Sequence, residues 1–400
     1  MRKSIRFLAV LSTVALLAAA CGGGEDPPAG GNGDDPVDKI PVSVTFQGAL
    51  SGDFVALVIH AFQAAELRFQ ELNDDPDFPA TITFEQGDTQ GDPENAPAVV
   101  EAVVGNPDTV AVIGPAFSGE SAASGDTYEE AGIPFITPSA TNPDLSANGW
   151  EYWYRAVAND TDQGAPLGQF AAQGHESVFI VQDESEYGLG LAEVVSETLA
   201  DAGVEEAGFE GAEVGTQDFS SVISDIESSG ADAVAYLGYV PDTAILTSQM
   251  RDAGLDIPVY SGDGSVSSDL LEVGGDSITD VFLSCPCSLS GDFLAQYNEA
   301  YPGSPVPVYA SEGYDVASMI GEGIQNAIDG GATDAAGIRE GIKETMDGYT
   351  TDSPFQGVVK TYAFDDVHEL DAENRAELIF LYEATPDAIT QLGNATEVLG

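Results

Sequence analysis

The chain has 400 residues, of which 68 are Asp or Glu and 11 are Lys or Arg, and its formal net charge at pH 7 is −57. So few basic residues cannot neutralise the phosphates of a nucleic acid, which excludes nucleic acid as a partner. The hydrophobic fraction of 43% and the dispersed acidic residues predict a folded core inside an acidic shell. We interpret the shell as a sign of a halophilic source, because salt would screen its self-repulsion; a merely acidic surface is the alternative.

The N-terminus predicts export and a lipid anchor. Basic residues precede an apolar stretch at Phe7–Ala20, which is too short for a membrane span and is typical of a signal peptide over residues 1–20. Small residues directly precede Cys21, so we expect lipidation at Cys21, with ordinary secretory cleavage as the alternative. Residues 21–38 are rich in Gly, Pro and Asp and are expected to form a flexible tether. The predicted location is the outer face of the cytoplasmic membrane, held there by lipid alone.

From residue 42 onward, short apolar runs alternate with stretches whose apolar residues recur at helical spacing. The expected strands are Val42–Phe46, Thr81–Phe84, Val110–Ile113, Phe135–Ile136, Ser177–Val181, Ala233–Leu237 and Val259–Tyr260. The expected helices are Ala56–Leu72, Pro93–Val104, Gly119–Glu130, Gly190–Asp201, Phe219–Ser228 and Ala244–Ala253. This alternation predicts an α/β fold of two similar lobes, each a parallel-type sheet flanked by helices, with right-handed crossovers.

Two consecutive strand–turn units within Val110–Pro143 carry hydroxyl side chains. They place Ser118, Ser139 and Thr141 at the carboxyl ends of strands, where open α/β sheets bind ligands. Small hydroxyls and free backbone N–H groups on rigid turns suit a carboxylate and an ammonium group. Because no base lies nearby in the sequence, this segment favours binding over catalysis.

The sequence offers little for an enzyme. Its only histidines are His60, His175 and His368, and none lies beside a plausible nucleophile or metal-ligand pair. Cys285 and Cys287 make a poor metal site without a His or Cys partner nearby. A bridge between them would close a small strained ring, so the sequence leaves open whether they are bonded or free. We therefore expect no catalysis, no cofactor and no metal.

Eight short motifs, taken together, identify a family. They are GALSG at Gly48–Gly52, GPAFSG at Gly114–Gly119, TPSATNP at Thr137–Pro143, Asp160-x-x-Gln163-Gly164, Glu186-Tyr187-Gly188, Asp218-Phe219-Ser220, Gly238-Tyr239-x-Pro241-Asp242 and Gly262-Asp263-Gly264. In this order and spacing, the region from about Val42 to Asp366 resembles the leucine/isoleucine/valine-type substrate-binding proteins of ABC transporters, which have the type I periplasmic-binding fold. The resemblance implies three crossings between the lobes, near Ala156–Asp160, Ser284–Leu289 and Phe364–Asp366. Lobe 1 is then expected at 39–157 plus 288–364, and lobe 2 at 158–287 plus 365–400.

The family's amino-acid site, carried over position by position, assigns roles in the first lobe. Ser118 is expected to donate its hydroxyl, and a backbone N–H from its turn or the next, to the ligand carboxylate. Thr141 is expected to hold both the carboxylate and the ammonium group. Ser139 and Ala140 are expected to offer main-chain groups.

The same resemblance assigns roles to the second lobe and to the side-chain pocket. Tyr187 and Tyr239 are expected to close over the ligand from opposite sides. Asp263 is expected to pair with the ligand ammonium through a charge-assisted bond. It is shorter than the glutamate of several relatives, which suggests a shifted ligand, a water bridge or tighter closure. Leu57, and with it Phe117, is expected to line the pocket for the ligand side chain.

These expectations describe a lipid-anchored receptor that binds an amino acid and delivers it to a membrane ABC permease. An apolar, in particular branched-chain, amino acid is the default because nothing in the sequence offers a charge for a charged side chain. Amides, urea or short peptides are alternative ligands, because the fold hosts them as well. A ligand-sensing module of a signalling system and a purely structural surface protein are the alternative classes.

Overall fold

The computed structural model describes residues 39–303, 306–371 and 375–400. The predicted signal peptide, Cys21 and the tether lie outside these residues. Among the residues that are described, no helix combines the length and the apolar character needed to cross a membrane.

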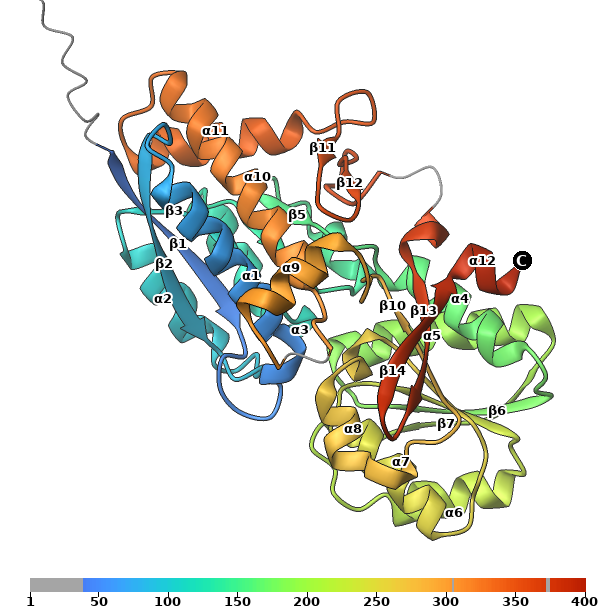
Figure 1. Cartoon of the computed structure of the whole chain (residues 1–400). Coiled ribbons are helices and arrows are strands. Elements are labelled where there is room, and N and C mark those ends of the chain that lie inside the picture. Colours follow the sequence, from blue (N-terminus) through green and yellow to red (C-terminus); the bar gives the residue numbers. More distant parts are fainter. Residues whose placement is uncertain (1–38, 304–305, 372–374) are drawn as a thin grey trace, which may run out of the picture. The chain divides into compact units, whose positions relative to one another are not determined.

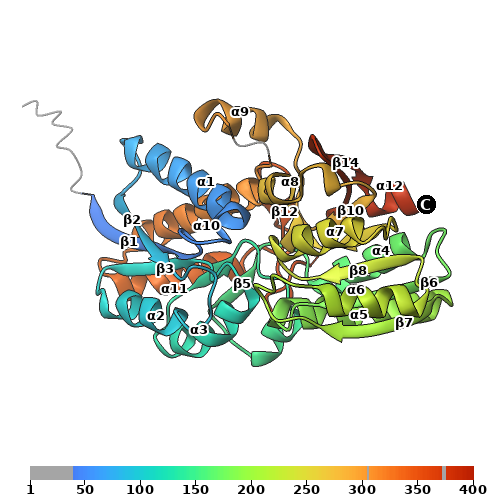
Figure 2. The same ribbon diagram turned by 90° about the horizontal axis from the view of Figure 1, so that it is seen from below.

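The structure has two large sheets, and the first, which is parallel, is built from the N-terminal part of the described chain (Figure 1). Its strands, in the order β2-β1-β3-β4-β5, are Ala80–Asp88, Ile40–Gly48, Thr109–Ile113, Phe135–Thr137 and Trp153–Arg155. Its helices are α1 (Val55–Asp74), α2 (Ala96–Gly105) and α3 (Ser118–Glu130), joined by α10 (Ala310–Asp329) and α11 (Ala335–Asp347) from later in the chain. Helices α1 and α10 pack side by side on one face of this sheet, and α2 and α3 lie on the other (Figure 2).

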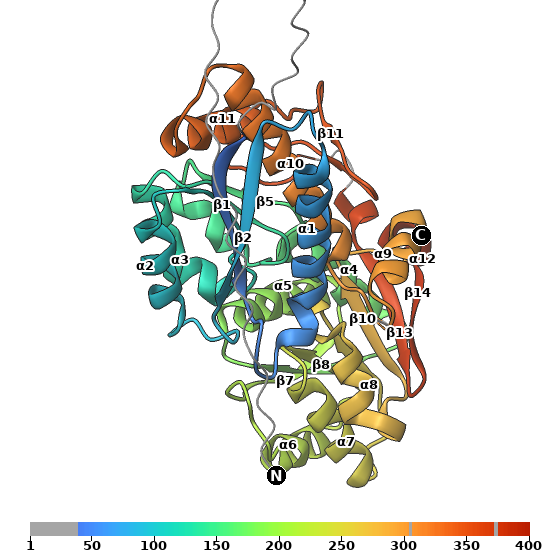
Figure 3. The same cartoon turned by 60° about the vertical axis from the view of Figure 1, so that its left-hand side comes forward.

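The second sheet has seven strands in the order β14-β13-β10-β9-β8-β6-β7. The parallel strands are β6 (Ser177–Gln182), β7 (Glu205–Gly211), β8 (Ala233–Leu237), β9 (Val259–Ser261) and β10 (Val281–Cys285). The antiparallel hairpin β13 (Phe380–Thr385) and β14 (Ala388–Asn394) extends this sheet beside β10 (Figure 3). Its helices are α4 (Asp160–Ala172), α5 (Glu186–Ala202), α6 (Ser220–Ser229), α7 (Asp242–Asp252), α8 (Ser268–Gly274) and α12 (Ala395–Leu399).

The chain passes between the two sheets three times. The passages are residues 156–159 after β5, residues 286–291 after β10, and residues 363–379 before β13. The segment between the second and third passages carries α9 (Asp292–Ala300), α10, α11 and the small hairpin of β11 (Phe355–Gln356) and β12 (Thr361–Tyr362). Each sheet, with the helices that belong to it, is called a lobe below.

The strands and helices expected from the sequence are all present, and the differences at their ends have local causes. Helix α2 begins at Ala96 rather than at Pro93, because Asp92 Oδ1 accepts the backbone N–H of Glu94 and holds a turn before the helix. Helix α5 begins at Glu186 because Ser185 caps it, its hydroxyl accepting the N–H of Gly188 at 2.9 Å. The strands β5, β7, β10, β11, β12, β13 and β14 and the helices α4, α8, α9, α10, α11 and α12 were not predicted.

The structure joins Cys285 and Cys287 in a disulfide, which settles the alternative that the sequence left open. Both cysteines are buried, and Cys285 is the last residue of β10. The bridge therefore lies at the start of the second passage between the lobes.

Candidate ligand-binding site

A small pocket lies between the two lobes at the carboxyl ends of their strands. It is lined by Leu57, Val58, Ala116, Phe117, Ser118, Ser139, Thr141, Tyr187, Tyr239, Asp263, Gly264 and Tyr309. All the ligand-binding residues proposed from the sequence, except Ala140, thus lie around one cavity. Their contacts with a ligand remain a prediction.

The hydroxyl groups of the first lobe differ in what they can still bind. Ser118 begins α3, and its Oγ accepts the backbone N–H of Asn142 at 3.2 Å. Its hydroxyl hydrogen is donated to no group within the described residues. Ser139, in contrast, donates its hydroxyl hydrogen to the carbonyl of Ala116 at 2.8 Å. Thr141 Oγ1 is buried and has no close hydrogen-bond partner among the described residues. Ser118 and Thr141 are therefore the hydroxyls best able to receive a polar ligand.

A buried ion pair holds the turn that carries Ser139 and Thr141. The Arg155 guanidinium, which is fully buried, donates to both carboxylate oxygens of Glu369, at 2.9 and 2.7 Å. It also donates to the carbonyls of Ala140, at 2.8 Å, and Asn142, at 2.9 Å. The turn is thereby fixed from behind by a planar group that makes four bonds.

The main-chain groups of Ala140 are already engaged in this conformation. Its N–H donates to Thr137 Oγ1 at 2.9 Å, and its carbonyl accepts from Arg155. Ala140 also does not line the pocket. Ala140 is therefore a residue of the turn whose main-chain groups hold the turn together, and it lies behind Ser139 and Thr141.

On the second lobe, Asp263 follows β9 and is held by three neutral donors. Its Oδ1 accepts from Gln163 Nε2 at 2.8 Å and from the Tyr187 hydroxyl at 2.9 Å, while Oδ2 accepts from the Tyr309 hydroxyl. Burial is the largest cause of the raised pKa of Asp263, and the three hydrogen bonds oppose it. No Lys, Arg or His lines the described pocket. The carboxylate therefore has hydrogen-bond donors but no cation.

The two glycines around Asp263 have a packing role. A Cβ atom at Gly262 would lie 2.4 Å from the Tyr187 hydroxyl, and one at Gly264 would lie 2.8 Å from the carbonyl of Gly238. Neither distance accommodates a side chain. The Gly-Asp-Gly pattern thus lets the segment approach Tyr187 closely enough for Asp263 to accept its hydroxyl.

A second carboxylate, Asp160, lies behind the pocket at the start of α4. It is fully buried, and neither of its oxygens has a close hydrogen-bond partner among the described residues, although the Thr141 hydroxyl is near enough to lower its pKa. Burial, and then the charge of Asp263, hold the pKa of Asp160 well above its usual range. The nearby Arg155 is already paired with Glu369. Two buried carboxyl groups therefore lie near each other, and within the described part of the chain no free cation accompanies them.

Aromatic rings from both lobes close the pocket on its outer side. Phe54 and Phe117 of the first lobe contact Tyr239 of the second, with ring centroids 5.6 and 5.4 Å apart. Tyr187 stacks on Tyr239 at 4.9 Å. Tyr239 is fixed by its backbone N–H, which donates to Asp183 Oδ2 at 3.0 Å. The aromatic cluster thus extends from Phe54 and Phe117 to Tyr187, whose hydroxyl donates to Asp263.

The sequence pointed to some parts of this site and missed others. Asp160 and Gln163 belong to a motif that carried the family resemblance, but no role was assigned to them. Tyr309 and Arg155 were not singled out at all. Tyr309 lies in no motif, and its role is seen only in the structure, where it lines the pocket, donates to Asp263 and has a backbone φ of 58°, unusual for a residue other than glycine.

Comparison with known proteins agrees with the fold. The model of the periplasmic binding protein family matches residues 41–369. The chain belongs to this family. It is a family of substrate-binding receptors rather than of enzymes, and membership implies an extracytoplasmic location.

Curated relatives match part of this length. The leucine-, isoleucine-, valine-, threonine- and alanine-binding protein of Pseudomonas aeruginosa is 31% identical over 242 residues, which are 59% of this chain and 65% of the relative. The Leu/Ile/Val/Thr-binding protein of Salmonella typhimurium is 31% identical over 252 residues, 62% of this chain and 68% of the relative. The chain thus covers less than two thirds of the first relative's length.

Solved structures resemble the chain over most of its length. A leucine-binding protein of Thermotoga maritima has a TM-score of 0.78 at 22% identity, covering 89% of this chain and all of the other. A branched-chain amino acid transporter substrate-binding protein of Streptococcus pneumoniae, in complex with isoleucine, has a TM-score of 0.75 at 20% identity, covering 88% and 99%. This likeness shows the α/β fold of two lobes that is typical of type I periplasmic binding proteins.

Proposed function

We propose that the protein is the substrate-binding receptor of an ABC importer, and that it binds an apolar α-amino acid, in particular a branched-chain one, in the pocket between the lobes. The observation that carries the proposal is that one cavity is lined by free hydroxyl groups from the first lobe and by a carboxyl group from the second. Ser118 and Thr141 of the first lobe face the pocket with unused hydroxyl capacity, and Asp263 of the second lobe faces it without a cation.

The first-lobe side of the pocket suits the ligand carboxylate. Helix α3 begins at Ser118, so the positive end of its dipole and its first backbone N–H groups lie beside the cavity. The free hydroxyl hydrogen of Ser118 adds a donor at the same place. A carboxylate at this end would be held by charge and by hydrogen bonds together.

The second-lobe side suits the ammonium group. Asp263 accepts hydrogen bonds and has a second buried carboxyl group, that of Asp160, as its neighbour. Neither has a cationic partner among the described residues, and the ligand ammonium group would supply one. Leu57, Val58 and Phe117 supply an apolar wall for the ligand side chain. These three features together favour a zwitterion with an apolar side chain over an anion or a neutral solute.

Delivery to the membrane follows from the family. We infer that the closed, loaded receptor docks on an ABC permease, and that Cys21 carries the lipid that keeps it at the membrane. Mass spectrometry of the protein isolated from membranes should show a diacylglyceryl-modified Cys21 as the N-terminal residue. A cleaved protein with an unmodified Cys21 would contradict the anchor and leave the receptor function intact.

The acidic shell is part of the proposal. We infer that the protein folds and works in molar salt, where the Debye length falls to about 3 Å. Its free energy of unfolding is expected to rise between 0.1 and 2 M NaCl. Urea unfolding at both salt concentrations measures this, and equal stability would contradict a halophilic adaptation.

Titration calorimetry of the purified protein tests the ligand class. The panel contains leucine, isoleucine, valine, alanine, phenylalanine, glutamate, acetamide and urea, each in low and in molar salt. Binding of one or a few aliphatic amino acids is the expected outcome. No binding across the panel by the folded protein would refute the amino-acid receptor.

A further inference from the structure

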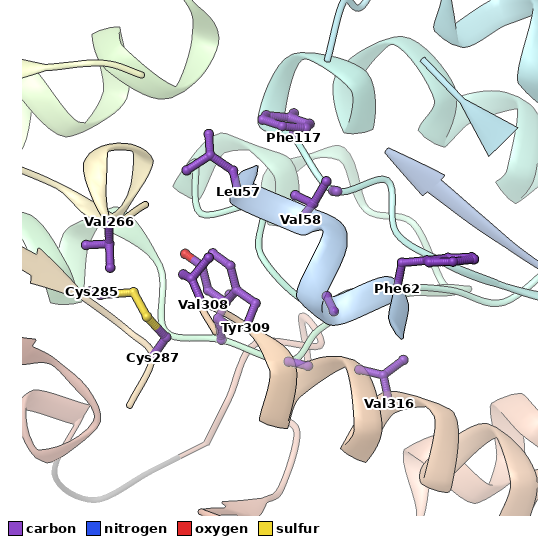
Figure 4. Close-up of a cluster of buried hydrophobic side chains, with 14 of the residues drawn as sticks. Leu57, Val58, Phe62, Phe117, Val266, Cys285, Cys287, Val308, Tyr309 and Val316 are labelled. Carbon is purple, nitrogen blue, oxygen red and sulfur yellow. A yellow bond between two sulfur atoms is a disulfide. The ribbon is translucent and has the colours of Figure 1, made fainter. Parts of the chain in front are cut away.

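The hydroxyl of Tyr309 makes a hydrogen bond that joins the two lobes through the ligand pocket. Tyr309 directly precedes α10 of the first lobe, and its partner Asp263 follows β9 of the second. Both side chains are buried, at 3% and 5% exposure. Figure 4 shows Tyr309 together with Leu57, Val58 and Phe117, which line the same pocket.

Tyr309 differs from the other two donors of Asp263. Gln163 lies on α4 and Tyr187 on α5, so both belong to the same lobe as Asp263 and remain with it when the lobes separate. Tyr309 alone of the three comes from the opposite lobe. Its bond is therefore the one that closing makes and opening breaks.

The backbone of Tyr309 is held in an unfavourable conformation to make this bond. Its φ is 58°, in the left-handed region that residues with a Cβ rarely adopt. Such a conformation persists where the surrounding contacts determine it. Val308 and Ala310 on either side are fully buried, so the chain around Tyr309 is enclosed by the protein.

We propose that the Tyr309 hydroxyl is a built-in substitute for the ligand's ammonium group. In the ligand-free protein it donates to Asp263 and holds the lobes closed. A ligand enters only if its own donor replaces this bond with a stronger one, so the receptor prefers ligands that carry an ammonium group over neutral solutes. The selectivity part rests on the proposed function, whereas the ligand-free closure does not.

The selectivity follows from the strength of the competing bonds. Both competing bonds end on the Asp263 carboxylate, so the phenol bond is charge-assisted as well, and an ammonium group adds to it the attraction between two opposite charges. An amide or urea N–H is neutral, like the phenol it would have to replace, and it gains little in the exchange. An ammonium group gains this attraction, and it also favours the charged forms of Asp263 and Asp160, which burial disfavours. Amides and urea are therefore expected to bind more weakly than an α-amino acid.

Two other contacts between the lobes would survive the loss of the hydroxyl. Asn142 Nδ2 donates to the carbonyl of Glu186 at 2.5 Å, and Tyr239 keeps its contacts with Phe54 and Phe117. Tyr309→Phe is therefore expected to fold and to shift the balance between open and closed forms. It removes one oxygen and leaves the ring in place.

Small-angle X-ray scattering of the ligand-free proteins tests the closure. The wild type is expected to have a smaller radius of gyration than Tyr309→Phe. Tyr154→Phe is the matched control, because its hydroxyl donates to Asp347 Oδ1 at 2.5 Å within the first lobe. The control should scatter like the wild type. If the wild type and Tyr309→Phe have equal radii of gyration, the Tyr309–Asp263 bond does not hold the ligand-free lobes closed. This conclusion does not depend on which ligand the protein binds.

Calorimetry with leucine and with 4-methylpentanamide, which lacks the ammonium group, tests the selectivity. Removing the competing hydroxyl should tighten leucine binding by between about twofold and tenfold, the effect of one hydrogen bond of ordinary strength. The amide should bind both proteins more weakly than leucine does, and it should bind Tyr309→Phe more tightly than the wild type by a similar factor. Weaker leucine binding to the variant would overturn the proposal and make the hydroxyl a ligand contact. If neither protein binds leucine but the ligand-free closure depends on Tyr309, the proposed function is contradicted. The role of the Tyr309–Asp263 bond in closure is then still supported.

Discussion

The buried ion pair of Arg155 and Glu369 gives the sharpest stability prediction. In Arg155→Met, the Glu369 carboxylate, whose side chain is 6% exposed, loses both of its guanidinium donors. The carbonyls of Ala140 and Asn142 lose a donor each. Removing one partner of a buried pair costs about 3–5 kcal/mol, because the other charge stays buried and unpaired. We expect a loss of that size in the free energy of unfolding.

Urea unfolding of a double-mutant cycle measures the loss and assigns its cause. The cycle contains Arg155→Met, Glu369→Gln and the double variant. Because the double variant buries no unpaired charge, it should be more stable than Arg155→Met, with a coupling of at least about 1 kcal/mol. A loss below about 1 kcal/mol in Arg155→Met, or additive effects, would show that Arg155 does not hold the Ala140–Asn142 turn.

Three further changes probe the pocket and the buried acids. Asp263→Asn should weaken binding of leucine by about 1.5–3 kcal/mol, the value of a hydrogen bond to a charged group, and unchanged affinity by calorimetry would remove Asp263 from the ammonium site. Gly262→Ala places a Cβ 2.4 Å from the Tyr187 hydroxyl and should lower the free energy of unfolding by about 1–3 kcal/mol, measured by urea unfolding. A loss under about 0.5 kcal/mol would show that the backbone at this position shifts to accommodate the Cβ. Burial raises the pKa of Asp315 from 3.8 to about 7, so the folded state holds a proton that the unfolded state has lost. Its contribution to stability is full below pH 3.8 and is lost as the pH rises through about 7. Asp315→Asn should flatten the fall in stability between pH 4 and 7, and an unchanged slope by urea unfolding would contradict the raised pKa.

The strands and helices that could be predicted are those whose signal lies within a short stretch of the sequence. Strand β3, all of whose residues are buried, and β8 are continuous apolar runs, and such runs between turn residues are visible in any window of sequence. Strand β7 was missed because it lies at the edge of the second sheet and exposes most of its residues. Hairpin β13–β14 was missed because antiparallel strands interrupt the βα alternation on which the prediction depended.

The same holds for the site: the residues that could be predicted are those that a short motif marks. Ser118, Thr141 and Asp263 lie directly after strands or at helix starts, where a parallel sheet brings side chains to one edge, and short motifs mark them. The groups that determine what those residues can bind come from far along the chain. Glu369 is 214 positions from Arg155, and Tyr309 is 46 positions from Asp263.

These distant partners change the chemistry that the motif alone would assign. An aspartate between two glycines looks in the sequence like a free carboxylate that waits for an ammonium group. In the structure it already accepts three hydrogen bonds, and one of them crosses from the other lobe. A ligand therefore competes with the protein itself for Asp263, so its affinity reflects the difference between two bonds rather than the strength of one. The identity of the residue at position 309, which no local pattern marks, is then as much a determinant of ligand choice as the aspartate.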